Sequence, residues 1–163
     1  MELQGQVAIV TGAGRGIGRA TALGLARMGA DIVVAELDRA NAEDTASELR
    51  GLGRRALVVQ TDVTSRDDLR AMVEQTRAEF GRIDALVNNA GIYRAATTLD
   101  VTEEHWDAIM NINAKGVFFA IQAVLPTMIA QKRGVIVSLA SMAGKIGSRC
   151  AFRSNVITDS GGT

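Results

Sequence analysis

One segment near the start of the chain, VAIVTGAGRGIG at residues 7–18, constrains the fold more than any other. Its apolar first part is long enough for one buried strand, and glycine then occupies every second position from residue 12 to residue 18. Helical spacing of apolar residues follows at once. A strand, a glycine turn and a helix in this order direct free backbone N–H groups and a positive helix end toward a phosphate. The segment therefore predicts a nucleotide-binding domain.

Five residues of this segment are the predicted nucleotide contacts: Gly12, Arg15, Gly16, Ile17 and Gly18. Glycines here permit a tight turn, close approach of the backbone to a pyrophosphate, and close packing of the helix on the strand. The spacing Thr-Gly-x-x-x-Gly-x-Gly is a variant of the commoner Gly-x-Gly-x-x-Gly pattern. The alternative is a plain strand-to-helix turn without a ligand. Two features argue against it: the glycine turn follows the first predicted strand, and a helix begins directly after it.

Strand-length apolar segments alternate with helical segments along most of the chain. Further strands are expected at 31–36, 56–59, 83–87 and 134–139, and further helices at about 39–52, 64–80 and 102–130. Such alternation requires right-handed crossovers and a parallel sheet that is covered on both faces. We therefore predict the α/β class, with a Rossmann-type doubly wound parallel sheet of about five strands.

The composition argues against several classes of function. The 163 residues suffice for one domain, and 18 basic residues balance 18 acidic ones, which favours neither a nucleic-acid surface nor a membrane surface. The longest apolar runs are strand-sized, so we expect no membrane span. A single cysteine, Cys150, and the lack of a signal-type segment favour the cytoplasm. No cluster of cysteine or histidine predicts a metal site.

Glu36 ends the second predicted strand, where an acidic side chain can accept hydrogen bonds from both ribose hydroxyls of an adenosine. Its charge would repel a 2′-phosphate, so it favours NAD over NADP. Arg15 argues the other way, because a guanidinium in the glycine turn could pair with that phosphate. We give Glu36 the greater weight. Asp62 and Val63 end the third strand, where the carboxylate could accept from the adenine amino group and Val63 could contact the ring.

The run Asn88-Asn89-Ala90-Gly91 follows the fourth predicted strand. Together with residues 11–18, 62–63 and 106–116, it resembles the short-chain dehydrogenase/reductase family over about residues 5–148. The resemblance implies strand order 3-2-1-4-5 and hydride transfer between a nicotinamide cofactor and a small alcohol or carbonyl substrate. It implies that Asn89, Ala90 and Gly91 line the cofactor and stabilise the central strands. It also implies that Asn113 holds a proton-relay water and that Ser141 hydrogen-bonds the substrate oxygen.

The pattern of that family breaks near the end of the chain. The family uses a tyrosine and a lysine four residues apart, but the expected positions hold Ser154 and Thr158, and no lysine follows Lys145. The one tyrosine, Tyr93, lies in another unit. We therefore expect a dinucleotide-binding domain at 1–148 and a non-family tail at 149–163, with the last strands and helices of the family missing.

Three interpretations of function stay open at this point. The first is an NAD(P)-dependent oxidoreductase by descent that is catalytically impaired or inactive in this chain. The second is a non-catalytic NAD-binding module, or a partner of a full-length relative, which associates through the long helix at 102–130. The third is a truncated gene product without function.

Overall fold

A computed structural model describes residues 2–141 of the chain. The elements run in the order β1 (Val7–Thr11), α1 (Gly16–Arg27), β2 (Asp31–Glu36), α2 (Arg39–Gly51), β3 (Ala56–Gln60), α3 (Arg66–Phe80), β4 (Ala85–Asn88), α4 (Glu103–Met110), η1 (Asn111–Gly116), α5 (Val117–Gln131) and β5 (Val135–Ser138). The predicted alternation of strands and helices is therefore confirmed over these residues. The predicted tail at 149–163 lies outside the described residues.

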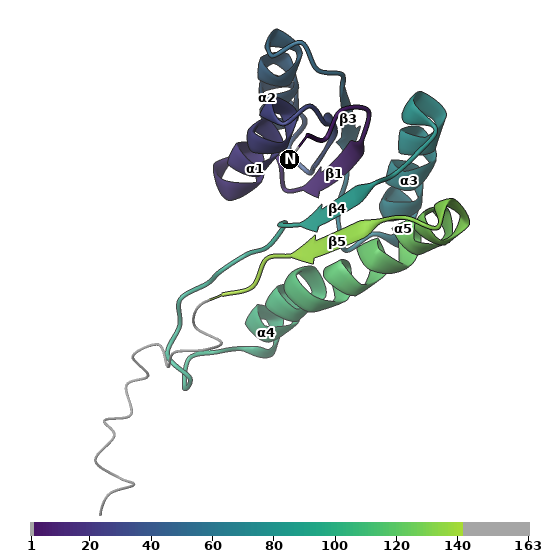
Figure 1. The fold of residues 1–163 in the computed structure, drawn as a ribbon. Helices are drawn as coiled ribbons and strands as arrows, with labels where there is room; N and C mark the ends of the chain where they lie inside the picture. Colours follow the sequence, from purple (N-terminus) through teal and green to yellow (C-terminus); the bar gives the residue numbers. More distant parts are fainter. Residues whose placement is uncertain (1, 142–163) are drawn as a thin grey trace, which may run out of the picture.

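The five strands form one parallel sheet in the order β3-β2-β1-β4-β5 (Figure 1). The order in which successive strands are added to the sheet reverses at β1, because β2 and β3 lie on one side of β1 and β4 and β5 lie on the other. Ligands of open α/β sheets bind at such a reversal, outside the carboxyl ends of the strands. The predicted fold class and strand order are both confirmed.

The side chains of β1 show how one strand serves two cores. Val7 and Ile9 point toward α3 and α5, whereas Ala8 and Val10 point toward α1 and α2. All four side chains are buried. The helices lie correspondingly on opposite faces of the sheet (Figure 1). This double covering explains why the sequence of β1 is apolar without alternation.

The single long helix expected over about 102–130 is confirmed, because the chain is continuously helical from Glu103 to Gln131. It contains a π-helical turn, η1, between α4 and α5. At its end the missing side chain of Gly116 makes room for Val63, because a Cβ there would lie 3.0 Å from Val63 Cγ2. α4 has no buried residue, and its Trp106 is exposed. The buried side chains of α5 are Ala120, Val124 and Met128.

Residues Glu103–Gln131 together are long and apolar enough to cross a membrane, judged by length and composition alone. A helix packed in a protein core meets the same criterion, so the expectation of no membrane span stays a prediction. Within α5, however, Ala120, Val124 and Met128 are buried in the core cluster that covers one face of the sheet. The apolar character of α5 is thus explained at least in part by packing on the sheet.

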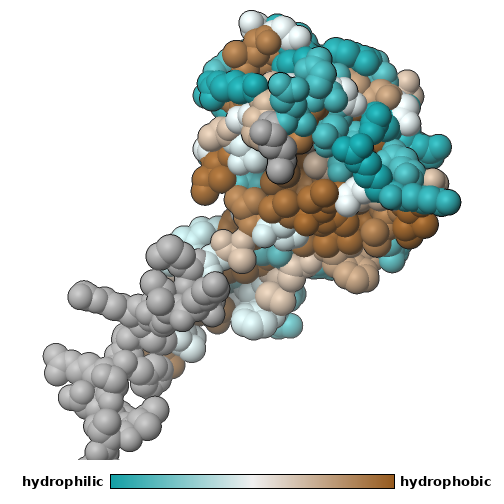
Figure 2. Space-filling view, in the orientation of Figure 1, coloured by the Kyte–Doolittle hydropathy of each residue, from teal (hydrophilic) through white to brown (hydrophobic). Residues whose placement is uncertain are grey.

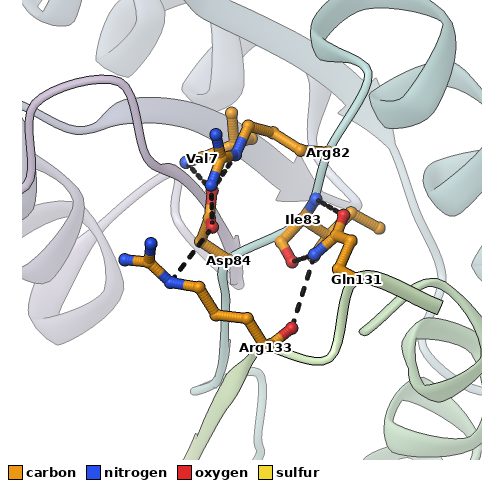
Figure 3. Close-up of polar contacts among 6 residues, drawn as sticks. All are labelled: Val7, Arg82, Ile83, Asp84, Gln131 and Arg133. Carbon is orange, nitrogen blue, oxygen red and sulfur yellow. Dashed lines mark hydrogen bonds and ion pairs between the residues drawn. The ribbon is translucent and has the colours of Figure 1, made fainter. Parts of the chain in front are cut away.

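The amino edge of the sheet is held by a polar cluster around Asp84, shown in Figure 3. The carboxylate accepts hydrogen bonds from Val7 N–H at 2.9 Å and from the Arg82 guanidinium at 2.7 and 2.6 Å, and Arg133 lies 3.8 Å away. Burial by itself would raise the pKa of Asp84, but these hydrogen bonds and the two positive charges outweigh it and lower the pKa. Nearby, the Gln131 amide pairs with the backbone of Ile83 at 3.0 and 2.8 Å. β4 begins at Ala85, two residues after the predicted start, and the backbone of Ile83 is bonded to the Gln131 side chain instead of to a neighbouring strand.

The opposite side of the molecule from β3 exposes apolar surface. Val135 and Val137 of β5 are exposed, and so is Leu139 just after the strand. Along α5, Phe118, Leu125 and Ile129 are exposed as well. Figure 2 shows apolar surface gathered across the middle of the molecule, over β5 and the adjoining helix.

Candidate cofactor site

A cleft of about 440 Å³ opens at the carboxyl edge of the sheet, over the reversal at β1. Volumes of roughly 300–1,000 Å³ are typical of small-molecule sites. The cleft is lined by Gly12, Arg15, Gly16, Ile17, Glu36, Leu37, Thr61, Asp62, Val63, Asn89, Ala90, Gly91, Ile92 and Ile112. All the predicted cofactor contacts except Gly18 are therefore brought together around one cavity, although they come from four separate parts of the chain.

The amino end of α1 faces this cleft without a cap. Arg15 occupies the cap position and its side chain makes no capping hydrogen bond, and no acidic residue lies in the first turn. The other α-helices that begin after a loop are capped: Asp38 caps α2, Ser65 caps α3 and Thr102 caps α4. The first N–H groups of a helix need an acceptor from outside the helix. At α1 a bound anion is the acceptor that fits.

The glycines of the turn divide into two groups by what surrounds them. A Cβ on Gly12 would lie 2.9 Å from Ala90 Cα, and one on Gly18 would overlap the carbonyl oxygen of Gly12 and the Asn89 amide. These two glycines therefore serve packing within the protein. Gly16 has φ +55°, and within residues 2–141 nothing lies within 4 Å of a Cβ position on it, so its backbone faces open space in the cleft. Gly18 lies beneath the cleft wall and does not line it.

Thr11 and Asn89 tie the glycine turn to the end of β4. The Thr11 hydroxyl oxygen accepts from the N–H groups of Asn89 and Ala90, each at 3.1 Å. The Asn89 Nδ2 donates to the carbonyl oxygens of Thr11 and Gly12, each at 3.0 Å. The amide of Asn89 thus joins the central strands while its residue lines the cleft. Both parts of the role predicted for this residue are compatible with its position.

Glu36 is held firmly at the end of β2. Its Oε2 accepts from Gly14 N–H at 2.9 Å, and its Oε1 accepts from Leu37 N–H at 2.9 Å and Asp38 N–H at 3.3 Å. A carboxylate offers about four lone-pair positions. Glu36 therefore retains room for one further donor, fewer than the two ribose hydroxyls of the sequence-based expectation, unless a backbone bond is released.

Asp62 and Val63 lie on the cleft wall, as expected for contacts of an adenine. The Asp62 carboxylate already accepts from the Thr64 backbone N–H at 2.8 Å and from the Thr64 hydroxyl at 2.7 Å. The turn after β3 is thereby fixed, and the carboxylate keeps acceptor capacity for a further donor.

The two predicted catalytic residues occupy different surroundings. The side-chain amide of Asn113 pairs with the backbone of Ile92, accepting from its N–H at 2.9 Å and donating to its carbonyl at 2.8 Å. Asn113 is thus joined to the loop after β4 and lies within the π-helical turn. Ser141 is exposed and lies beyond the end of β5. Ser138 is the last residue of β5, and its hydroxyl oxygen accepts from Asn88 Nδ2 at 3.2 Å. Ser154 and Thr158 lie outside the described residues.

Four residues of the cleft wall were missed by sequence reasoning: Leu37, Thr61, Ile92 and Ile112. Leu37 and Thr61 each follow the last residue of a strand, so the sheet topology alone could have indicated them. Ile92 follows Gly91 and Ile112 precedes Asn113, two residues that the resemblance picks out. The hydrogen bond between Ile92 and Asn113 brings the two isoleucines to the same wall of the cleft.

The sheet, the reversal of strand order and the open helix end over the cleft define a Rossmann-type domain of the kind that binds dinucleotides. Comparison with known proteins narrows the class, because the model of the short chain dehydrogenase family matches residues 6–152. The chain belongs to this family, whose members bind nicotinamide dinucleotides.

Individual relatives agree with this assignment. The chain is 42% identical over 148 residues to the 3-oxoacyl-[acyl-carrier-protein] reductase FabG of Thermotoga maritima, with 91% of this chain and 60% of that protein covered. It is 43% identical over 141 residues to the 2-dehydro-3-deoxy-D-gluconate 5-dehydrogenase of Escherichia coli, with 86% and 55% covered. A structure of 7α-hydroxysteroid dehydrogenase complexed with NADH and 7-oxo glycochenodeoxycholic acid is similar, with a TM-score of 0.86 and 33% identity over 90% of this chain and 57% of that one.

The chain spans 60% or less of the length of these three proteins. The family match extends to residue 152, a little beyond the predicted domain boundary at 148. That boundary lies outside the described residues and stays a prediction.

Proposed function

We propose that this chain carries the NAD-binding part of a short-chain oxidoreductase and that its own catalytic activity is impaired. The observation that carries the proposal is the uncapped amino end of α1, which faces the cleft beside the fixed carboxylate of Glu36. An open helix end supplies N–H donors to a pyrophosphate, and a carboxylate at the end of β2 accepts from an adenosine ribose.

The residues present fit such a cofactor. Open space over Gly16 leaves room for a phosphate against the backbone, and the exposed Ile17 adds an apolar contact at the same helix end. Asp62 and Val63 supply a polar and an apolar contact on the far wall, where an adenine would lie. Asn89, Ala90 and Gly91 close the floor of the cleft. When bound, the nicotinamide would accept or supply a hydride in exchange with an alcohol or carbonyl.

NAD is preferred over NADP in this proposal. Glu36 and the neutral Leu37 line the part of the cleft where we place the 2′-position of the ribose, and the half-buried carboxylate of Glu36 disfavours a second anion beside it. The exposed guanidinium of Arg15 lines the same cleft and opposes this preference. It is not among the groups that hydrogen-bond Glu36, which are the N–H groups of Gly14, Leu37 and Asp38. The hydroxysteroid dehydrogenase structure with NADH supports the choice by similarity.

The proposed impairment follows from the missing tyrosine and lysine. Asn113 and Ser141 would still serve the positions that hold a relay water and the substrate oxygen, but a serine hydroxyl at position 154 cannot replace a lysine-assisted phenol as the general acid–base group. Loss of such a group costs roughly 10²- to 10⁴-fold in rate. We expect oxidation of a panel of small secondary alcohols to be slower by at least this factor than with a full-length relative.

A non-catalytic role is the second candidate, and the exposed apolar side chains of α5 favour it. Phe118, Leu125 and Ile129 lie on a helix that a second copy or a full-length relative could cover. In this proposal the chain is a cytoplasmic NAD-binding partner that associates through the helical region at 102–130. Light scattering on the purified chain, alone and mixed with a full-length relative, tests it: an unchanged monomer mass in both samples would contradict the association.

Cofactor binding is tested by thermal unfolding of the purified chain with and without millimolar NAD⁺. A ligand that binds only the folded state stabilises it by about 2.7 kcal/mol at a hundredfold excess over Kd. We expect a cooperative transition that NAD⁺ shifts upward. A transition that NAD⁺ leaves unmoved would contradict the proposal.

A further inference from the structure

Thr45 stands among apolar residues on the buried face of α2. The other buried residues of this helix are Ala42, Ala46 and Leu49. Thr45 itself is fully buried. Burying a hydroxyl costs free energy unless it is hydrogen-bonded, so the contacts of this hydroxyl show what the residue does.

The Thr45 hydroxyl reaches two carbonyl oxygens. It donates to that of Asn41, one turn earlier in α2, at 3.1 Å and to that of Gly14, in the glycine turn, at 3.3 Å. A bond to the carbonyl four residues earlier is the usual local contact of a helical threonine. The bond to Gly14 instead joins α2 to a segment 31 residues away in the chain. The hydroxyl therefore links α2 to the turn that forms one wall of the cleft.

Gly14 is held through both of its peptide groups. Its N–H donates to Glu36 Oε2 at 2.9 Å, and its carbonyl oxygen accepts from Thr45. The residue is buried, and a Cβ on it would lie 2.8 Å from Asn41 Cβ, so its backbone packs directly on the first turn of α2. The uncapped helix α1 begins two residues later. The position of Gly14 therefore determines where the open helix end lies.

We propose that Thr45 is a positioning residue for the cofactor: its hydroxyl fixes the Gly14 carbonyl and thereby places the amino end of α1 against the pyrophosphate. The inference rests on the proposed function, because it requires a phosphate to bind at that helix end. Thr45 is not among the residues that line the cleft, so it acts through Gly14 and not by contact with the ligand. Hydrogen bonds from N–H groups to a phosphate depend on distance and angle, so a displaced helix end binds the phosphate less tightly.

Two buried threonines allow a matched experiment. Thr45→Val removes the hydroxyl and keeps the branched shape, whereas Thr45→Ser keeps the hydroxyl. Thr76 is also fully buried and donates to the carbonyl four residues earlier, that of Met72, at 2.6 Å. It lies in α3, on the opposite face of the sheet from α2, so Thr76→Val removes the same local bond without touching the glycine turn. Calorimetric titration of the whole chain gives the Kd values of NAD⁺, ADP and adenosine, and urea unfolding gives the stability of each variant.

We expect Thr45→Val to raise the Kd values of NAD⁺ and ADP roughly two- to tenfold, the value of one hydrogen bond between neutral groups. The Kd of adenosine, which has no phosphate, should stay unchanged, because only the contact at the helix end is displaced. Thr45→Ser should restore the affinity for ADP. Thr76→Val should lower stability but leave all three Kd values unchanged.

Two results would overturn the positioning role and leave the proposed function intact. One is equal NAD⁺ affinity in Thr45→Val and Thr76→Val, and the other is an equal loss of affinity for adenosine and ADP in Thr45→Val. Thr45→Ala, which also lacks the hydroxyl, takes the place of Thr45→Val if that variant does not fold. Failure of the unmodified chain to bind NAD⁺ would instead overturn the proposed function, and this inference with it.

Discussion

The two edges of the sheet handle polar groups in opposite ways. At the amino edge, the buried Asp84 binds Val7 N–H and Arg82, and Gln131 satisfies the backbone of Ile83. At the carboxyl edge, the amino end of α1 has no cap and Gly16 faces open space. Buried polar groups need partners, and a helix end without an internal one is available to a ligand. Polar groups that are hydrogen-bonded within the chain therefore belong to the structural frame of the domain, whereas the open N–H groups at the end of α1 belong to the candidate cofactor site.

The carboxyl edge itself contains parts of both kinds. The pairs formed by Thr11 and Asn89 belong to the frame even though Asn89 lines the cleft. Lining a cavity is therefore a weaker indication of ligand binding than lacking an internal partner. Variants that remove frame contacts should mainly lower the free energy of unfolding, and variants at the open end of α1 should mainly lower the affinity for NAD⁺.

Asp84→Ala should have the largest effect on stability. It leaves Val7 N–H without its carboxylate acceptor and removes the partner of Arg82. Because Arg82 is exposed and keeps its hydration, the loss is that of hydrogen bonds to a charged group, about 1.5–3 kcal/mol. We expect a loss of this size in urea unfolding, and an NAD⁺ affinity that is unchanged under conditions where the variant is folded. A loss under about 1 kcal/mol would mean that the amino edge does not depend on this cluster.

The same cluster predicts a dependence of stability on acid. Because the pKa of Asp84 is lowered in the folded state, its contribution is complete above the usual aspartate pKa near 4 and is lost as the pH falls through the lowered value. In Asp84→Asn the slope of stability against pH below about pH 4 should be shallower. Parallel slopes for the two proteins would contradict this origin.

Gly18→Ala should have the next largest effect. Its Cβ would overlap the Gly12 carbonyl and the Asn89 amide, both of which belong to the frame. Overpacking of this kind costs about 1–3 kcal/mol. Gly24→Ala is the matched control in the same helix, since nothing lies within 4 Å of its Cβ position. The control should be neutral or slightly stabilising, and equal losses in both variants would contradict the assignment.

Thr11→Val tests the frame contacts that lie closest to the site. The change keeps the shape of the side chain but removes the acceptor of Asn89 N–H and Ala90 N–H. Leaving such donors unpaired costs about 1–3 kcal/mol. Melting curves should show this loss, with NAD⁺ affinity reduced only as far as the cleft floor shifts. If the free energy of NAD⁺ binding fell by more than the free energy of unfolding, Thr11 would belong to the cofactor site and not to the structural frame.

Much of the contrast between the amino and carboxyl edges of the sheet could be predicted from local sequence patterns. The strand order follows from the alternation and the family resemblance, and the glycine spacing at residues 12–18 located the open helix end. The π-helical turn could not be predicted, because an apolar period near 3.6 does not reveal one extra residue in a turn. The pairing of Asn113 with Ile92 joins segments 21 residues apart, and that of Asp84 with Val7 joins segments 77 apart. Such contacts depend on the assembled sheet.

Gly16→Ala should have the smallest effect on stability and the clearest effect on binding. No atom lies within 4 Å of its Cβ position, so the cost is limited to placing alanine at φ +55°, about 1–2 kcal/mol. The new methyl group would project into the open space over the end of α1, where we place the pyrophosphate. We expect NAD⁺ affinity to fall at least about tenfold, the equivalent of one lost hydrogen bond to a charged group. Gly53→Ala, at φ +75° with equally open surroundings but away from the cleft, separates backbone strain from obstruction. If both variants lose affinity equally, the open end of α1 is not where the cofactor binds, and the contrast between the two edges would have to be explained without a ligand.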